Sequence, residues 1–123
     1  MACICQKAQS VRILENNCCG LPPYTYGYIT AARSLARKNL DRLKDPNLDL
    51  IVTDCASCAS FLKTYPRLFS SGGPEFEEAR ILASRVRDLT EVAAASKSFS
   101  LPDSETHVIT YHDPCHASRG QGI

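Results

Sequence analysis

Two pairs of cysteines constrain the fold of this chain more than any other feature of its sequence. A Cys-Cys-Gly sequence stands at residues 18–20 and a Cys-x-x-Cys sequence at 55–58, and residues 21–54 separate them. That separation has the length of one helix and one strand, so the fold can return the second pair to the first. Four sulfurs brought together make a soft-metal site, of the kind that holds zinc or an iron–sulfur cluster. The candidate ligands are Cys18, Cys19, Cys55 and Cys58.

The chain has seven cysteines among 123 residues, and the redox compartment decides whether such cysteines form disulfides. Residues 1–10 lack the apolar core of a secretion signal, and no apolar run approaches the roughly 20 residues that span a bilayer. We therefore expect a cytoplasmic protein without a transmembrane segment, in which metal or redox use of the thiols is favoured over disulfides. The net charge of +1 gives no indication of a nucleic-acid partner.

Alternating strand and helix signals predict a small α/β fold, in two or three layers, with a short parallel sheet and crossover helices. Apolar and β-branched residues predict strands at 10–14, at 48–53 and at 106–111. The continuous apolar run in the second of these is typical of a strand covered on both faces. Proline and polar residues predict a turn at 21–26 and a loop at 112–116.

Helices are predicted from apolar residues spaced three and four apart. One such stripe runs over residues 28–44. Asp54 precedes the next helix, and its carboxylate is predicted to cap that helix. Pro74 and the glutamates after it predict a third helix, whose apolar stripe extends to Leu89. A further helix start is predicted at Thr90.

The predicted fold places both cysteine pairs where open α/β sheets bind ligands, beyond the ends of strands. Adjacent cysteines on an extended backbone point to opposite sides, so a turn is needed for both to face one centre, and Gly20 supplies it. Cys55 and Cys58 are expected at a helix start, where free N–H groups and the helix dipole stabilise thiolate.

These motifs resemble the cysteine-rich CCG domain. It occurs in heterodisulfide reductase and in the iron–sulfur subunits of glycolate oxidase, lactate oxidation complexes and anaerobic glycerol-3-phosphate dehydrogenase. The similarity to the lactate and glycolate subunits is carried by residues 18–28, 32–40, 49–65 and 111–122. In that family a leading cysteine precedes the CCG and CxxC sequences, and the whole motif usually occurs twice.

The resemblance implies a single CCG domain over residues 1–123, with the start of a second repeat at about 106–123. Cys115 would be the leading ligand of that repeat and is an additional candidate metal ligand. The second CCG and CxxC sequences and a leading cysteine at the family's spacing before Cys18 are missing, so we expect a truncated member of the family. The implied cofactor is a [4Fe-4S] cluster, cubane or non-cubane, bound by Cys18, Cys19, Cys55 and Cys58.

The implied function is electron transfer in a 2-hydroxy-acid (lactate or glycolate) oxidase-type complex, or in one like heterodisulfide reductase. The chain would be the electron-transfer part of an oxidoreductase and not a catalyst by itself. Its implied partners are a flavin-containing 2-hydroxy-acid dehydrogenase subunit and the other subunits of the complex. Through them, the cytoplasmic face of the membrane is a second expected location.

Two other interpretations of the cysteines stay open. The four thiols can form a zinc site that serves only structure. Alternatively, Cys55 and Cys58 can act as a thiol–disulfide pair, although that chemistry has no use for an adjacent cysteine pair. A second candidate metal site around Cys115 is suggested by His112, Asp113 and His116. A turn held by hydrogen bonds from the aspartate to the backbone is favoured there instead.

Overall fold

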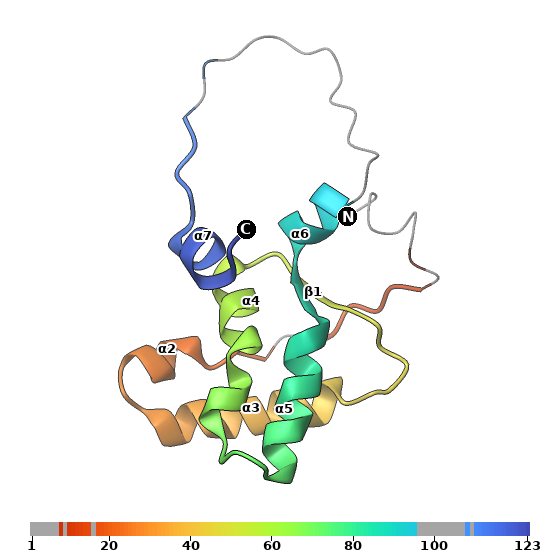
Figure 1. Cartoon of the computed structure of the whole chain (residues 1–123), viewed down its shortest axis with the longest axis vertical. Coiled ribbons are helices and arrows are strands. Elements are labelled where there is room, and N and C mark those ends of the chain that lie inside the picture. Colours follow the sequence, from red (N-terminus) through yellow and green to blue (C-terminus); the bar gives the residue numbers. More distant parts are fainter. Residues whose placement is uncertain (1–7, 9, 16, 96–107, 109) are drawn as a thin grey trace.

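Helices packed around a short two-stranded parallel sheet make up the fold (Figure 1). A computed structural model describes residues 8, 10–15, 17–95, 108 and 110–123. Their order along the chain confirms the predicted small α/β fold. The elements are α2 (Leu21–Thr25), α3 (Ile29–Leu43), β1 (Ile51–Thr53), α4 (Ala56–Lys63), the 3-10 helix η1 (Tyr65–Leu68), α5 (Pro74–Arg85), β2 (Val86–Asp88), α6 (Leu89–Ala95) and α7 (Cys115–Gln121).

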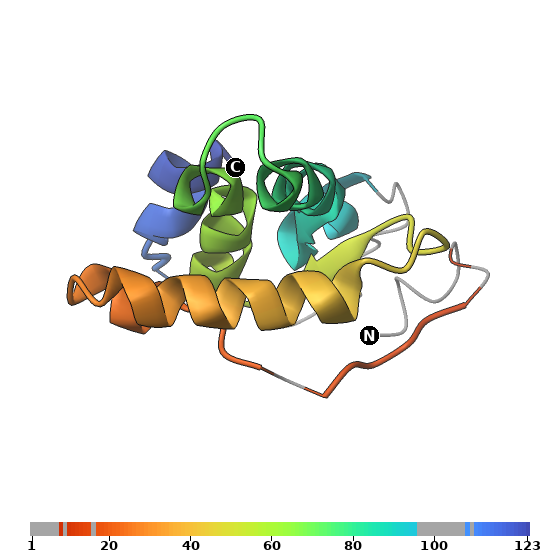
Figure 2. The same cartoon turned by 90° about the horizontal axis from the view of Figure 1, so that it is seen from below.

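The sheet pairs β1 with β2 in parallel, with Ile51 opposite Val86 and Thr53 opposite Asp88. Parallel neighbours need a long connection, and α4, η1 and α5 supply it. Figure 2 shows α3 running along one side of the molecule, with α4 and α5 packed against that side. Because α4 follows β1 directly along the chain, its start lies at the carboxyl end of that strand, where the sequence predicts the CxxC pair.

The hydrophobic core gathers side chains from α3, α4, η1, α5 and β2, and Cys19 is part of it. Tyr65 and Val86 are the largest fully enclosed side chains. Burying one large apolar side chain stabilises a fold by about 1.5–3 kcal/mol. Because Cys19 belongs to this cluster, the same packing holds the CCG segment against the helices. The buried members are Cys19, Ala36, Leu40, Ala59, Phe61, Leu62, Tyr65, Leu68, Ala79, Leu82 and Val86.

The prediction of three strands is wrong for the described residues, which hold a two-stranded sheet. β1 is shorter than the predicted strand at 48–53, and Val52 is 37% exposed, so the strand is not covered on both faces. Residues 10–14 are exposed and form no strand where they are described, because β-branched residues need a pairing partner as well as propensity. Of the strand predicted at 106–111, residues 106, 107 and 109 lie outside the described part, and the other three are not in a strand.

The strand β2 is missing from the prediction, which places its residues in a helix reaching Leu89. α5 instead ends at Arg85, and the next three residues pair with β1. Val86 fits both a helical stripe and a sheet. It is fully buried, and its pairing with β1 places it in the sheet. α6 then begins one residue before the predicted start at Thr90.

The predicted helix at 28–44 is confirmed by α3, whose bounds differ by one residue at each end. The turn predicted at 21–26 is wrong for residues 21–25, which form the short helix α2, and Tyr26 after it lies in a turn. The prolines of α2 lie at the first helical positions, where a backbone donor is not needed.

The predicted cap on the CxxC helix is also wrong. Cys55, not Asp54, is the N-cap residue of α4, and no side chain makes a capping hydrogen bond there. The loop predicted at 112–116 is interrupted, since α7 begins at Cys115 directly after Pro114.

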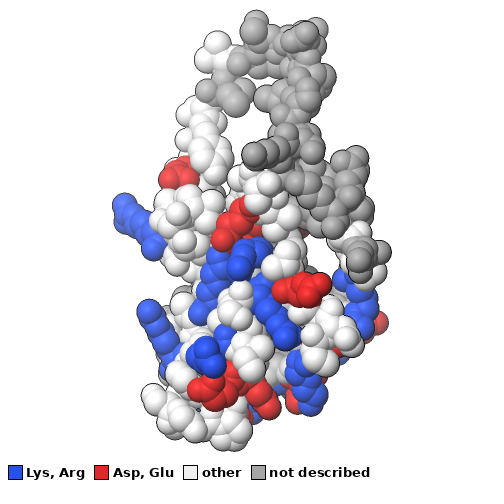
Figure 3. Space-filling model, turned by 45° about the vertical axis from the view of Figure 1, so that its right-hand side comes forward, with Lys and Arg blue, Asp and Glu red and all other residues white. Residues whose placement is uncertain are grey.

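No helix in the described part of the chain is both long and apolar enough to cross a membrane. Basic and acidic side chains are interspersed on the face shown in Figure 3. Ion pairs join Arg37 to Glu75, Lys63 to Glu91 and Arg80 to Glu77.

Candidate metal centre

The CCG segment turns sharply at Gly20, the N-cap residue of α2, which has a left-handed backbone with φ 94°. A Cβ atom at this position would lie 3.3 Å from the carbonyl oxygen of Ala32 and 3.4 Å from the ring of Phe61. Both the conformation and the tight packing therefore require glycine. The turn also brings the Gly20 N–H to the sulfur of Cys18, 3.4 Å away.

Two buried side chains hold the backbone of the cysteine pair. The side-chain amide of Asn39, in α3, donates to the carbonyl oxygen of Cys18 at 3.1 Å and to the hydroxyl oxygen of Tyr65 at 2.8 Å. The Tyr65 hydroxyl in turn donates to the carbonyl oxygen of Cys19 at 2.6 Å. Both carbonyls of the pair thus point to α3 and η1.

The CxxC pair lies at the junction of β1 and α4. The backbone N–H of Cys55 donates to the hydroxyl of Thr53 at 3.2 Å, and the Cys55 carbonyl accepts the first helical bond, from Ala59 at 2.9 Å. Cys58 follows in the first turn and is partly buried. The open N–H groups and positive dipole of a helix start favour negative sulfur, but at Cys58 burial outweighs them.

The fold brings sulfurs of the two pairs together around Cys58. Burial raises the pKa of the Cys58 thiol well above its ordinary value, and the neighbouring Cys19 and Cys55 raise it further through hydrogen bonding and charge repulsion. Burial also raises the pKa of Tyr65, opposed by its bond with Asn39, and Cys18, Cys19 and Cys58 add to the increase. Cys19 and Cys55, one from each pair, are therefore neighbours of Cys58, and Cys18 acts on the Tyr65 hydroxyl.

A metal cofactor suits this donor set. Burial, together with the neighbouring Cys19 and Cys55, makes a thiolate at Cys58 costly, and a bound cation would offset that cost and deprotonate its ligands. Within the described residues, however, no three His, Cys, Asp or Glu side chains are close enough to hold a single metal ion.

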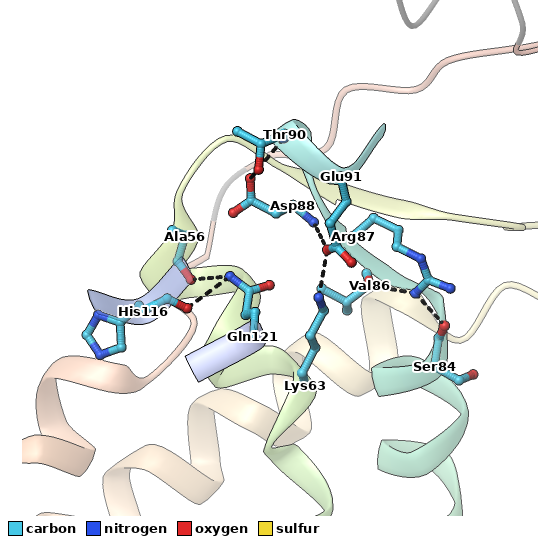
Figure 4. Close-up of polar contacts among 10 residues, drawn as sticks. All are labelled: Ala56, Lys63, Ser84, Val86, Arg87, Asp88, Thr90, Glu91, His116 and Gln121. Atoms are coloured by element: carbon cyan, nitrogen blue, oxygen red, sulfur yellow. Dashed lines mark hydrogen bonds and ion pairs between the residues drawn. The ribbon is translucent and has the colours of Figure 1, made fainter. Parts of the chain in front are cut away.

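Cys115 begins the helix α7, which packs against α4 (Figure 4). The contact with the CxxC helix is made by its neighbours: the His116 ring lies 2.9 Å from the Ser57 hydroxyl, and the Gln121 amide donates to the Ala56 carbonyl at 3.0 Å. The Cys115 sulfur is exposed and lies 3.9 Å from the His116 ring. His112 and Asp113 are exposed as well.

Asn39 and Tyr65 are site residues that the sequence analysis did not single out. One signal was available for Asn39, which stands three residues after Ala36 and four before Leu43 and so shares the apolar face of its helix. A polar residue in such a position is buried with a hydrogen-bond partner. For Tyr65, nothing in the sequence indicated the partner of its hydroxyl.

Comparison with known proteins identifies a family for the cysteine-bearing part of the chain. Residues 6–63 match the family model described as CCG, a cysteine-rich domain. The chain therefore carries a cysteine-rich domain of the CCG family, and the matched segment includes both cysteine pairs.

Individual relatives are similar over most of the chain. The protein named lactate utilization protein A in Geobacillus kaustophilus is 35% identical over 108 residues, which are 86% of this chain and 44% of the relative. Its namesake in Geobacillus thermodenitrificans is 37% identical over 83% of this chain and 42% of the relative. An uncharacterized iron-sulfur protein of Methanocaldococcus jannaschii is 36% identical over 93% of this chain and 21% of its own length. The chain thus spans less than half the length of these relatives, and no solved structure gives a significant match.

Proposed function

We propose that the chain binds an iron–sulfur cluster through Cys18, Cys19, Cys55 and Cys58 and serves as an electron carrier. The observation that carries the proposal is the approach of Cys19 and Cys55 to Cys58, which joins two sequence motifs into one sulfur-lined region. Similarity to proteins named for iron–sulfur content and for lactate utilization supports it. When bound, the cluster supplies one-electron redox chemistry.

The protein's own residues supply the surroundings that such a cofactor needs. Cys19 is 7% exposed and packs in the core, which keeps one side of the site dry. The Gly20 N–H donates to sulfur, and the start of α4 adds a positive dipole. Burial and hydrogen bonding of this kind set the reduction potential of a cluster.

A [4Fe-4S] cluster is the form we propose, in preference to a single zinc ion. Around a zinc ion all ligand sulfurs meet at one point, whereas each thiolate of a cluster binds a different iron and the sulfurs stay farther apart. The name of one relative, an uncharacterized iron-sulfur protein of Methanocaldococcus jannaschii, supports the cluster over zinc.

For the biological setting we propose a complex that oxidises a 2-hydroxy acid such as lactate or glycolate, in the cytoplasm or at its membrane face. A flavin-containing dehydrogenase subunit would deliver the electrons. The support is the name of the relatives, lactate utilization protein A. Residues 106–123 would begin a second repeat, with Cys115 as its leading cysteine.

The test is anaerobic purification, reconstitution with iron and sulfide, and visible and EPR spectra before and after addition of dithionite. We expect a brown protein whose absorbance bleaches on reduction, and loss of this chromophore in Cys19→Ser. A colourless chain with stoichiometric zinc would contradict the proposal and favour a structural site. A metal-free chain with a reversible Cys55–Cys58 disulfide would favour thiol–disulfide chemistry.

A further inference from the structure

We infer that Tyr65 tunes the proposed cluster by orienting the Cys19–Gly20 peptide, so that its N–H group is aimed at the sulfur of Cys18. The inference rests on the proposed function for its redox consequence, although the orientation itself is a property of the chain alone. Tyr65 acts here as a positioning residue, because it contacts the peptide and not the sulfur.

One peptide group carries both interactions. The carbonyl of Cys19 accepts the Tyr65 hydroxyl hydrogen at 2.6 Å, and the N–H of the same peptide, which belongs to Gly20, lies 3.4 Å from the Cys18 sulfur. A peptide group is planar and its C=O and N–H point in opposite directions. A hydroxyl that fixes the carbonyl on one side therefore fixes the N–H on the other side.

The hydrogen bonds leading to this peptide all run in the same direction. Asn39 donates to the Tyr65 hydroxyl at 2.8 Å, Tyr65 donates to the Cys19 carbonyl, and the peptide N–H points to sulfur. Each donor polarises the next group in such a chain, which strengthens the last bond. Asn39 is 7% exposed and Tyr65 is fully buried, so water does not compete for these groups.

The consequence for the cluster has a definite sign. A hydrogen bond to a ligand sulfur stabilises negative charge, and the reduced cluster carries more of it than the oxidised one. The relay therefore raises the reduction potential. Removing the Tyr65 hydroxyl weakens the final bond to sulfur and lowers that potential.

The first experiment compares Tyr65→Phe with the matched control Tyr24→Phe by EPR-monitored redox titration of the reconstituted protein. Tyr65→Phe keeps the ring, which packs edge-on against Phe61, and removes only the hydroxyl. Tyr24 also packs against Phe61, in a tilted arrangement, and is 41% exposed. We expect a more negative midpoint potential in Tyr65→Phe, unchanged iron content, and a wild-type potential in Tyr24→Phe.

Equal potentials in the two variants, or a positive shift in Tyr65→Phe, would overturn the inference. So would loss of iron from a folded Tyr65→Phe protein, since Tyr65 would then be needed for assembly and not for tuning. Asn39→Ala is the second variant, because it leaves the tyrosine in place and removes the donor to its hydroxyl, together with the donor to the Cys18 carbonyl. It should shift the potential in the same direction by a smaller amount.

A second measurement needs no cluster. Hydrogen exchange of the Gly20 amide, followed by NMR in the iron-free chain, should be faster in Tyr65→Phe than in Tyr24→Phe, because the peptide is free to turn. Equal exchange rates would overturn the relay. If the wild-type chain binds no iron, the proposed function fails, and this exchange measurement still decides whether Tyr65 orients the peptide.

Discussion

Gln121 donates its side-chain amide to the backbone carbonyl of Ala56 across 3.0 Å, although the two residues are 65 positions apart in the sequence. This bond ties α7 to the first turn of the CxxC helix. The same amide nitrogen lies 3.2 Å from the carbonyl of His116, which fixes the glutamine side chain between the two helices. The position of α7, and of Cys115 at its start, is therefore set by contacts with α4.

The close packing of α7 on α4 predicts that Gly120→Ala destabilises this contact. A Cβ at Gly120 would lie 2.5 Å from the hydroxyl oxygen of Ser60, so either that side chain must rotate or one of the helices must move. Overpacking of this kind costs about 1–3 kcal/mol. Urea unfolding of the iron-free chain measures the cost. The control is the double variant with Ser60→Ala, which removes the clashing hydroxyl and should recover most of the lost stability. Equal losses in the single and double variants would contradict this packing.

The buried amide of Asn39 predicts a stability difference between neighbouring positions of α3. Asn39→Ala leaves the Cys18 carbonyl without its donor, and an unpaired buried polar group costs about 1–3 kcal/mol. Lys38→Ala, next to it on the exposed face, should change the free energy of unfolding by less than about 0.5 kcal/mol. Both are read from urea unfolding curves, and equal effects would show that Asn39 does not hold the CCG backbone.

A third prediction concerns the carboxylates at the end of β2 (Figure 4). Burial by itself raises the pKa of Glu91, but its bonds with Lys63 at 2.6 Å and the Asp88 N–H at 2.8 Å outweigh burial and lower that pKa. The pKa of Asp88 is lowered in the same way, against burial, by Thr90 and Gln121.

Groups whose pKa is lower in the folded chain stabilise it above their unfolded pKa of about 4, and this stabilisation is lost as the pH falls through the folded value. We expect the free energy of unfolding to fall between about pH 6 and about pH 3, and to fall less in Glu91→Gln. Glu78→Gln, at an exposed position of α5, serves as the control for removal of one carboxylate. An identical pH dependence in Glu91→Gln and wild type would contradict the role given to Glu91.

The sequence predicted the elements whose signals are local. The apolar stripe of α3 and the spacing of the four cysteines are both readable from neighbouring residues, because a helix and a metal-ligand motif repeat within a few positions. β2 was not predictable in this way. Val86 continues a helical stripe, and only pairing with β1 makes the three residues of β2 a strand.

The contacts of the supporting residues were not predictable either, although the place of Asn39 on the apolar face of its helix indicated that it is buried. Tyr65 and Asn39 act through backbone carbonyls of Cys19 and Cys18, and any residue type presents such a carbonyl. No sequence pattern therefore marks these contacts, which arise only when α3 and η1 pack against the CCG turn.

Iron and acid-labile sulfide per chain, measured after anaerobic reconstitution of wild type, Cys55→Ser and Cys115→Ser, test the central claim most directly. Binding of one cluster by the four cysteines predicts about four iron atoms per chain in wild type and in Cys115→Ser, and loss of the cluster in Cys55→Ser. A wild-type chain without iron, or a Cys55→Ser chain that retains the wild-type iron content, would contradict it.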